Sequence, residues 1–432
     1  MGKKSLIGVS LGLITCCLVI IGVAVWAIGE EKKNQDVVAE DTQTTETNLS
    51  YETEVEEVEP QKIRLLMTGD NLMHLSMVYS GSQPDGTLNY DMMFEPLKEH
   101  LAYADIKITN QETIFGGNHL GFSAFPRFNS PTELGDAIVK AGYNVVLHAS
   151  NHAADKGIEG IFNCLEFWKQ YPEVLVTGIY EEADVENQDI GLIEVDGVTF
   201  AILNYTYSPN LAALPKSIQG HLAMLCDWNP SNGMIDYKNL HPDVLTDIET
   251  AKQMADVVVV CPHWGTEYTF VPSSYQKKFA QQMTEAGADL IIGTHPHVIQ
   301  PVEWVTAENG NKALCYYSLG NYVSTQDRAQ TMLEAMAWVT FEVNEDGVKI
   351  IEEETGAIPM VCHYTRSRLR LEKVYFLEDY TEEKVKEHGI HYYDVGNYTL
   401  DNLHMWAEEV LGEWMLLSQD VFCERIESEY RK

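Results

Sequence analysis

Short apolar runs alternate with amphipathic segments over residues 61–358, which predicts a sheet of strands joined by helices. Five of the apolar runs cover residues 62–68, 105–109, 144–148, 256–260 and 288–292. Runs of this length, bounded by Gly and Pro, are typical of buried parallel strands. The carboxyl ends of such strands line the crevice where α/β sheets bind ligands. We therefore predict an α/β fold with a ligand site along one edge of its sheet.

The fifth run leads into His295-Pro296-His297. Pro296 fixes its own φ and favours extended geometry at His295, so both imidazoles would lie on a stiff segment. Such a pair suits one metal ion or two neighbouring ions. A histidine-rich turn without metal is the alternative, because His-x-His alone is a weak pattern.

The other four runs deliver carboxylate, amide and imidazole groups to the same predicted edge. They lead to Asp70 and His74, to Glu112, to Asn151 and His152, and to His263 and Glu267. Burying such groups without partners costs about 1–3 kcal/mol each, whereas a bound cation would stabilise them together. The pattern therefore favours a site for two divalent metal ions.

Several local signals mark the elements around this edge. Residues 131–142 predict a helix, and residues 153–170 predict another that begins just after His152. The stretch 344–347 predicts a hairpin, with antiparallel strands at one edge of the sheet. We assign residues 61–358 to this main domain.

The C-terminal segment 359–432 shows a different pattern. Its pattern predicts mainly helices, with an amphipathic stretch at residues 400–417. We therefore predict a mainly helical extension that packs against the main domain.

The N-terminal segment predicts a membrane anchor. Residues 5–28 are apolar and uncharged, and at about 1.5 Å per residue they would span a hydrocarbon core of about 30 Å. Lys3 and Lys4 predict a cytoplasmic tip at residues 1–4, and the lack of an Ala-x-Ala site favours an uncleaved single-pass anchor with the bulk of the chain extracellular. A buried core helix is the alternative.

Charge and composition narrow the range of partners. Residues 29–60 are rich in Glu, Thr and Gln and predict an acidic disordered linker. The 432-residue chain carries a net charge of −36, which argues against nucleic acid as a partner. A polyanionic substrate would need a local cationic grip.

Six short motifs follow one another in the main domain. They are Gly69-Asp70, Asn110-Gln111-Glu112, the stretch 149–157 that contains Asn151 and His152, the stretch 263–268, Gly293-Thr294-His295-Pro296-His297 and the stretch 317–321. Together they resemble the CapA-type poly-γ-glutamate capsule synthesis proteins, a branch of the calcineurin-like metallophosphoesterase superfamily. The resemblance implies a four-layer αββα sandwich.

The resemblance also implies roles for the polar residues. Glu112 would bridge two divalent ions, for which Mn, Fe and Zn are plausible identities. Asp70, His297 and His74 would bind one ion, and Asn151, His263 and His295 the other. The chain differs from the superfamily at two positions, with Glu112 in place of the usual bridging Asp and Leu72 in place of a His.

His152 would act as an acid or hold an anion in this family; a helix-capping or core role is the alternative. Four further residues are candidates for substrate binding: Arg127, Asn204, Glu267 and Asn321. Arg127 lies in an aromatic loop and offers a planar fork for carboxylate or phosphate, although a packed loop with a solvated Arg explains it equally well. Asn204 poses the same choice, and Asn321 falls in a turn beside the site.

Three functions remain open at this point. The first is a protein that makes, exports or processes poly-γ-glutamate at the cell surface, where other capsule-synthesis membrane proteins would be its partners. The second is a metal-dependent phosphoesterase for cell-wall or lipid phosphates, and the third is a polymer-binding module without turnover. The family resemblance favours the first.

Overall fold

The computed structural model describes residues 60–183, 185, 187–365 and 370–422. The predicted anchor and nearly all of the predicted linker lie outside these residues. Within the described ranges, no helix is both long and apolar enough to cross a bilayer.

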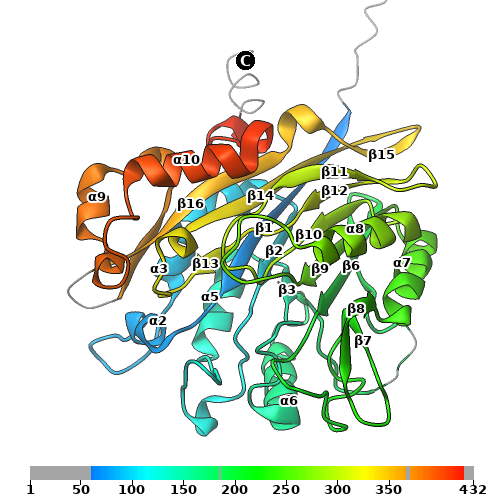
Figure 1. The fold of residues 1–432 in the computed structure, drawn as a ribbon, viewed down its shortest axis with the longest axis horizontal. Coiled ribbons are helices and arrows are strands. Elements are labelled where there is room, and N and C mark those ends of the chain that lie inside the picture. Colours follow the sequence, from blue (N-terminus) through cyan, green and yellow to red (C-terminus); the bar gives the residue numbers. More distant parts are fainter. Residues whose placement is uncertain (1–59, 184, 186, 366–369, 423–432) are drawn as a thin grey trace, which may run out of the picture. The chain divides into compact units, whose positions relative to one another are not determined.

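Two large sheets organise the described chain (Figure 1). The first sheet contains nine strands in this part of the chain. In spatial order it runs β17 (Leu371–Phe376), β16 (Gly356–Tyr364), β14 (Leu333–Asn344), β1 (Gln61–Asn71), β2 (Ile106–Asn110), β3 (Val145–Leu147) and β4 (Leu175–Thr177), with β13 (Asn321–Val323) on β1 and β15 (Gly347–Ile350) on β14. Strands β1 to β4 are parallel, and β14, β16 and β17 are antiparallel to their neighbours.

The second sheet has six strands among the residues described. Its order is β11 (Val302–Thr306), β12 (Lys312–Tyr316), β10 (Leu290–Ile292), β9 (Val257–His263), β6 (Val198–Thr206) and β5 (Gly191–Val195), and a separate pair is formed by β7 (Cys226–Trp228) and β8 (Ile235–Leu240). Its four middle strands are parallel, and β5 and β11 are antiparallel edges.

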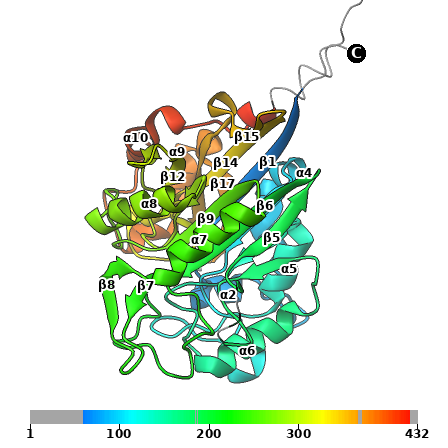
Figure 2. The ribbon, with the colours of Figure 1, turned by 90° about the vertical axis from the view of Figure 1, so that its right-hand side faces the viewer.

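Helices lie against both sheets (Figure 2). On the first sheet or near it are α2 (Leu75–Ser80), α3 (Asp91–Phe94), α4 (Lys98–Tyr103), α5 (Glu133–Ala141) and α6 (Gly157–Trp168), and on the second α7 (Pro242–Met254) and α8 (Ser274–Ala286). Near β16 lie α9 (Glu382–Glu387) and α10 (Leu400–Leu411) (Figure 1). The predicted mixed α/β architecture is therefore confirmed, and it is consistent with a layered sandwich.

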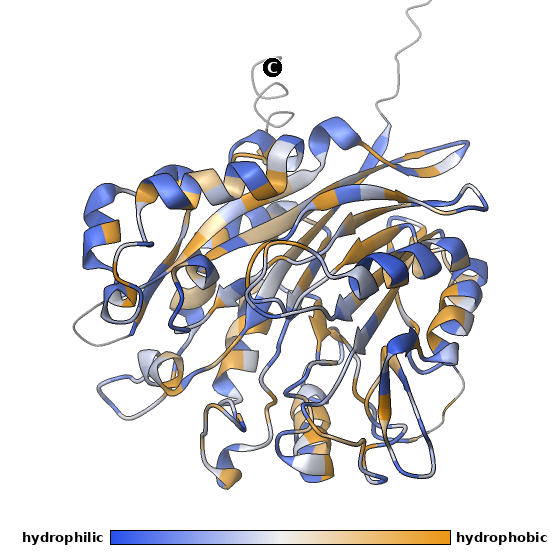
Figure 3. Cartoon of the chain, viewed as in Figure 1, coloured by the Kyte–Doolittle hydropathy of each residue, from blue (hydrophilic) through white to orange (hydrophobic). Residues whose placement is uncertain are grey.

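The two sheets share an apolar core. The rings of Phe200 in β6 and Phe341 in β14 meet edge to face, with centroids 5.2 Å apart. Residues Val257–Val260 of β9 are at most 3% exposed, and burying one such side chain contributes about 1.5–3 kcal/mol. Figure 3 shows hydrophobic residues concentrated along the strands. Burial on both faces explains why these strands read as continuous apolar runs.

The C-terminal segment differs from its prediction. The expected boundary at residue 358 falls inside β16, and β17 follows it, so part of the segment completes the first sheet. Pro359 lies within β16 opposite Ala335, and a Pro in an apolar run argues against a strand when only the sequence is read.

The hairpin prediction is correct in its turn, and one of its two strands, β15, lies at an edge with β14 as its only neighbour among the strands described. Asn344 pairs with Gly347 at the predicted turn. However, β14 is an interior strand between β1 and β16, because β16 and β17 extend the sheet beyond it.

Candidate metal centre

Six of the predicted ligands lie together at the carboxyl ends of parallel strands. Asp70 lies near the end of β1, and Glu112 and Asn151 follow β2 and β3. From the second sheet, His263 ends β9, while His295 and His297 follow β10. All six side chains are buried. The topology therefore gathers ligands from two sheets into one place.

Close backbone packing positions Asp70. A Cβ atom at Gly69 would lie 2.0 Å from the carbonyl oxygen of Gly320, so only Gly fits there. This approach lets the Asp70 N–H donate to Gly320 O over 3.0 Å. The Asp70 carboxylate is then held by Asn110 Nδ2 at 2.6 Å and by the backbone N–H of His295 at 3.2 Å.

The potential ligand atoms form two groups that share Glu112. One group is Asp70, Glu112 and His297, and the other is Glu112, His263 and His295. Within each group the ligand atoms lie within 4.8 Å of one another. A carboxylate common to both groups is the arrangement expected of a residue that bridges two ions.

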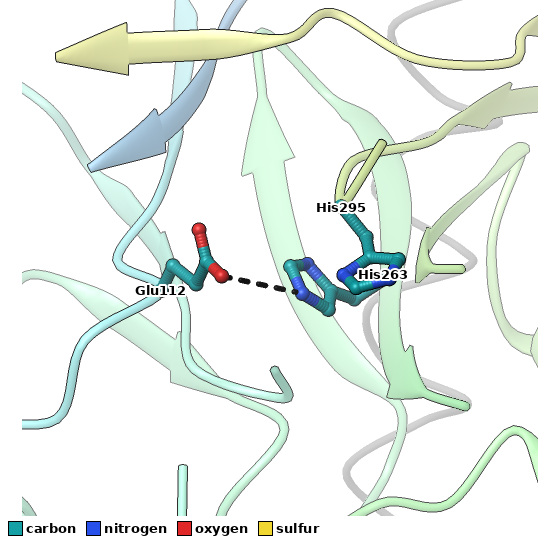
Figure 4. Close-up of side chains that lie close together, drawn as sticks. All are labelled: Glu112, His263 and His295. Carbon is teal, nitrogen blue, oxygen red and sulfur yellow. Dashed lines mark ion pairs between the residues drawn. The ribbon is translucent and has the colours of Figure 1, made fainter. Parts of the chain in front are cut away.

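The separations between Glu112 and the two imidazoles that face it exceed hydrogen-bond length. Nε2 of His263 lies 3.8 Å from Oε1 of Glu112, and Figure 4 shows the carboxylate facing this imidazole with His295 beside it. Nδ1 of His297 lies 3.4 Å from Oδ2 of Asp70 and 3.9 Å from Oε2 of Glu112. The carboxylate of Glu112 therefore faces both imidazoles across a gap and does not pair with either of them directly.

Unsatisfied polar atoms indicate that a cation fits this space. Both carboxylate oxygens of Glu112, Nδ1 of His295 and Oδ1 of Asn110 are buried and have no hydrogen-bond partner among the residues that the structure describes. Leaving such atoms unpaired costs about 1–3 kcal/mol each. Carboxylate oxygen and imidazole nitrogen are ordinary ligands of Mn, Fe and Zn. The residues are thus able to hold a metal ion.

The electrostatics favour positive charge at the same place. Burial and the neighbouring Asp70 carboxylate hold the pKa of Glu112 well above its usual range. Burial alone would lower the pKa of His297, but Glu112 and Asp70 outweigh it and raise this pKa to about 9. Burial and the adjacent imidazoles lower the pKa values of His263 and His295, so these two rings are neutral and can act as ligands.

Neighbouring side chains orient the ligands. Nδ1 of His263 lies 2.9 Å from Thr294 Oγ1, and Nε2 of the same ring lies 2.8 Å from Oδ1 of Asn151. Nδ1 of His297 lies 2.9 Å from Asn321 Oδ1, which fixes that ring in turn. Asn321 therefore lies beside the centre and contacts a ligand.

The backbone of the two histidines differs from the prediction. The sequence predicts extended geometry at His295, but its φ is +99° and that of His297 is +59°. The hydrogen bonds from the His295 N–H to Asp70 and from the Tyr268 N–H to Pro296 O hold this turn. Left-handed geometry at residues other than Gly is costly and collects at functional sites.

His152 lies in a turn, because α6 begins at Gly157 rather than at residue 153. Its Nδ1 atom is 2.7 Å from Oδ2 of Asp155, and the same oxygen accepts the Phe128 N–H at 2.6 Å. The Phe128 ring packs edge to face on His152, with centroids 4.6 Å apart. His152 is therefore fixed in orientation beside the ligand groups.

His74 lies beside the centre but in neither of the two groups that share Glu112. Its ring contacts Phe128, and its Nδ1 accepts the Thr325 N–H at 3.4 Å. Burial and the nearby His297 and His152 lower the pKa of His74 to about 4.

The remaining substrate candidates occupy three different environments. Arg127 is exposed on the loop before Phe128. Glu267 is exposed, and its carboxylate forms a third potential group with His295 and His297. Asn204 is buried, and both ends of its amide are bonded, to the Ala149 N–H at 2.6 Å and to Cys261 O at 2.8 Å. Asn204 therefore ties the two sheets together.

Sequence reasoning did not single out Asn110, Thr294 or Asp155 as site residues. Each lies within a recognised motif, but its importance depends on contacts from another element or a later turn. Their place within these motifs is the signal in the sequence that could have identified them. The contact itself appears only in the folded chain.

Comparison with known proteins identifies relatives of this chain. Residues 64–326 match the family model described as bacterial capsule synthesis protein PGA_cap. The chain is 35% identical over 208 residues to the PGA biosynthesis protein CapA of Bacillus subtilis (strain 168), covering 48% of this chain and 49% of that protein. It is 32% identical over 222 residues to the capsule biosynthesis protein CapA of Bacillus anthracis, covering 50% and 48%. The matches thus span about half of these relatives.

Among solved structures, a hypothetical protein from Thermus thermophilus aligns with a TM-score of 0.39 and 13% identity. The alignment covers 69% of this chain and 99% of that one.

Proposed function

Because the chain belongs to the family of bacterial capsule synthesis proteins, we propose that it processes an anionic capsule polymer of the poly-γ-glutamate type by metal-dependent hydrolysis or transfer. The observation that carries this proposal is the sharing of Glu112 between two buried ligand groups. A module that only binds polymer has no need for six converging ligands with unsatisfied atoms.

In this proposal Asp70, Glu112 and His297 hold one divalent ion, and Glu112, His263, His295 and Asn151 hold the other. Bound ions would polarise the bond under attack and make water more acidic. The layered sheets and helices support the further assignment to the calcineurin-like metallophosphoesterase sandwich.

The protein's own side chains supply the remaining chemistry. His152 can donate a proton from Nε2 to the leaving group, because Nδ1 faces the Asp155 carboxylate at 2.7 Å. The carboxylate thereby fixes the orientation of the ring. Phe128 packs against the ring and keeps water from that side.

The location of this activity also forms part of the proposal. Residues 5–28 anchor the protein in the cell membrane with residues 1–4 in the cytoplasm, and residues 29–60 hold the catalytic domain outside the cell. A site outside the cell could act on polymer as other membrane proteins of the capsule system deliver it.

A metal-dependent phosphoesterase for cell-wall or lipid phosphates is the second candidate. The observation that favours it is the His152–Asp155 pair beside two ligand groups, since this arrangement suits a phosphate ester as well as an amide.

An assay with two substrates separates these functions. Full-length protein in detergent would be freed of metal, reloaded with Mn²⁺, Fe²⁺ or Zn²⁺, and given poly-γ-glutamate or bis(p-nitrophenyl) phosphate. We expect metal-dependent shortening of poly-γ-glutamate on gels. Release of nitrophenol without polymer shortening would support the phosphoesterase, and binding without turnover of either would support the polymer-binding module.

A further inference from the structure

Arg328, which is not among the predicted site residues, stacks over the ring of Tyr268 at the edge of the metal centre. Cζ of Arg328 lies 4.0 Å from the centroid of the Tyr268 ring. Arg328 is exposed, and Tyr268 is partly buried. A guanidinium that stacks through its flat face keeps its in-plane N–H donors available for a second partner. Arg328 has no ion pair among the residues that the structure describes.

Tyr268 joins this arginine to the metal centre. The Tyr268 N–H donates to Pro296 O at 2.8 Å, between the two ligand histidines. The Tyr268 and His297 rings have centroids 6.0 Å apart. Its neighbour Glu267 forms a potential ligand group with His295 and His297. The stacked pair of Arg328 and Tyr268 therefore lies beside the predicted metal ligands.

Hydrogen bonds fix the position of this ring. Asn321, which contacts His297, donates to Gln326 Oε1 at 2.9 Å, and Gln326 Nε2 lies 3.3 Å from the Tyr268 hydroxyl. The backbone of Tyr268 has a φ of +63°, and Gln330 Nε2 contacts its carbonyl oxygen at 3.3 Å. Such left-handed geometry persists only where the surroundings enforce it. The ring is therefore a preformed platform for Arg328.

A second exposed arginine, Arg127, precedes a residue that packs beside the metal centre. Phe128, next to Arg127, contacts the rings of His152 and His74, and His74 contacts Thr325 three residues before Arg328. A continuous series of contacts therefore links the neighbourhoods of the two arginines. In a chain with a net charge of −36, two exposed arginines whose neighbours contact the metal centre would attract an anionic ligand locally.

We propose that Arg328, stacked on Tyr268, is a subsite for a carboxylate of a polyanionic chain, which Arg127 contacts at a second point. The planar fork matches a carboxylate with two parallel hydrogen bonds. A polymer with one carboxylate on every unit would engage both arginines at once, so that its affinity would exceed that of a single unit. This inference rests on the proposed function and identifies residues that would bind the substrate at the same site.

The test measures binding separately from turnover. Full-length protein in detergent, kept metal-free with chelator, would be titrated with labelled poly-γ-glutamate. We expect Arg328→Gln to weaken binding about 10- to 100-fold, as loss of a charged, bidentate contact predicts. Arg328→Lys should weaken it as well, because Lys keeps the charge but loses the fork. Lys349→Gln, at an exposed site on β15, is the matched control and should bind as the parent does.

Further variants check the stack and the second contact. Tyr268→Phe keeps the ring and should retain most of the affinity, whereas Tyr268→Ala should approach Arg328→Gln. Arg127→Gln and Arg127→Lys should each weaken binding to the polymer far more than binding to free glutamate. Melting temperature and metal content after reloading would verify that the variants fold.

The outcomes distinguish the subsite from the proposed function. If the parent and Arg328→Gln bind poly-γ-glutamate equally, the subsite is overturned while the proposed function stands. If the parent ignores poly-γ-glutamate but binds inorganic polyphosphate, the carboxylate assignment and the proposed substrate both fail. Selective loss of poly-γ-glutamate binding in Arg328→Gln supports both.

Discussion

Oε1 of Glu112 and Nε2 of His263 face each other at 3.8 Å in the buried centre, too far apart for a hydrogen bond. Two ligands of one ion are commonly separated by somewhat less than twice a metal–ligand distance of about 2.0–2.2 Å. The separation is therefore one that a shared cation would span with little movement. It also makes Glu112 the residue on which both ligand groups depend.

Replacing Glu112 with Gln should remove most of the bound metal. The substitution keeps the size of the side chain but deletes the charge common to both groups, so we expect occupancy of both ions to fall at least about tenfold. Elemental analysis after gel filtration would measure it. Glu334→Gln is the matched control, because Glu334 is also fully buried, has no hydrogen-bond partner within the described part of the chain and lies outside the ligand groups. Equal metal content in both variants would contradict the prediction.

The histidines should separate metal binding from stability. His295→Ala and His297→Ala should each lose more metal affinity than the about 10–100-fold typical of residues behind the ligands. His148→Ala should lower the free energy of unfolding without lowering metal content, since His148 is buried and accepts the Trp168 indole N–H at 2.8 Å. Mass spectrometry of metals and thermal unfolding would give the two readouts. Parental metal content in both ligand variants would end the proposal of a metal pair.

Replacing Asp155 with Asn should lower turnover while leaving metal bound. The change removes the charge that orients His152, and general acid catalysis typically contributes about 10²–10⁴-fold. We expect a fall in kcat within this range, with metal content unchanged. A loss of metal equal to the loss of rate would instead indicate that Asp155 supports the ligands.

Glu334→Met should stabilise the protein at neutral pH. Glu334 lies on β14, and neither of its carboxylate oxygens has a partner in the described ranges. Burial raises the pKa of Glu334 well above its usual range. A carboxyl with a raised pKa in the folded state favours folding below its unfolded pKa of about 4.3 and loses this contribution as pH rises. We therefore expect a gain of about 1–3 kcal/mol in the free energy of unfolding at pH 7 and a smaller gain at pH 4.

Urea unfolding at both pH values would measure the Glu334 effect. Glu345→Met, at an exposed site in the β14–β15 turn, should change stability by less than about 0.5 kcal/mol. Destabilisation of Glu334→Met at pH 7 would show that the carboxylate has an essential partner.

The membrane topology is testable in intact cells. A membrane-impermeant maleimide should label Thr45→Cys, in the predicted linker, but not Gly2→Cys, beside Lys3 in the predicted cytoplasmic tip. The expectation follows from the positive charge on one side of the apolar segment. Labelling after lysis would check that both thiols react. The opposite pattern in intact cells would reverse the orientation.

The sequence predicted strands and ligand turns well where one element carries the signal. The apolar runs before Asp70 and His263 are strands, as predicted. Both faces of these strands are buried, so nearly every position is apolar and the signal lies within the run itself. The C-terminal strands were not predicted, since β16 contains Pro359 and gains its stability by pairing with β14. For Asn204 the sequence leaves substrate binding and packing as alternatives, because its hydrogen bonds go to two backbone groups distant in sequence. Contacts across the sheets are the information that a linear pattern lacks.

The left-handed turn at His295 and His297 implies a trade-off between stability and function. Glycine would adopt these φ values freely, so each imidazole is retained at a position where it costs stability, about 1–3 kcal/mol for the more strained geometries. His295→Gly should therefore relieve backbone strain while removing a ligand. Selection for thermal stability alone would then drive this turn toward glycine, and metal-free but more stable variants would accumulate unless activity is selected together with stability.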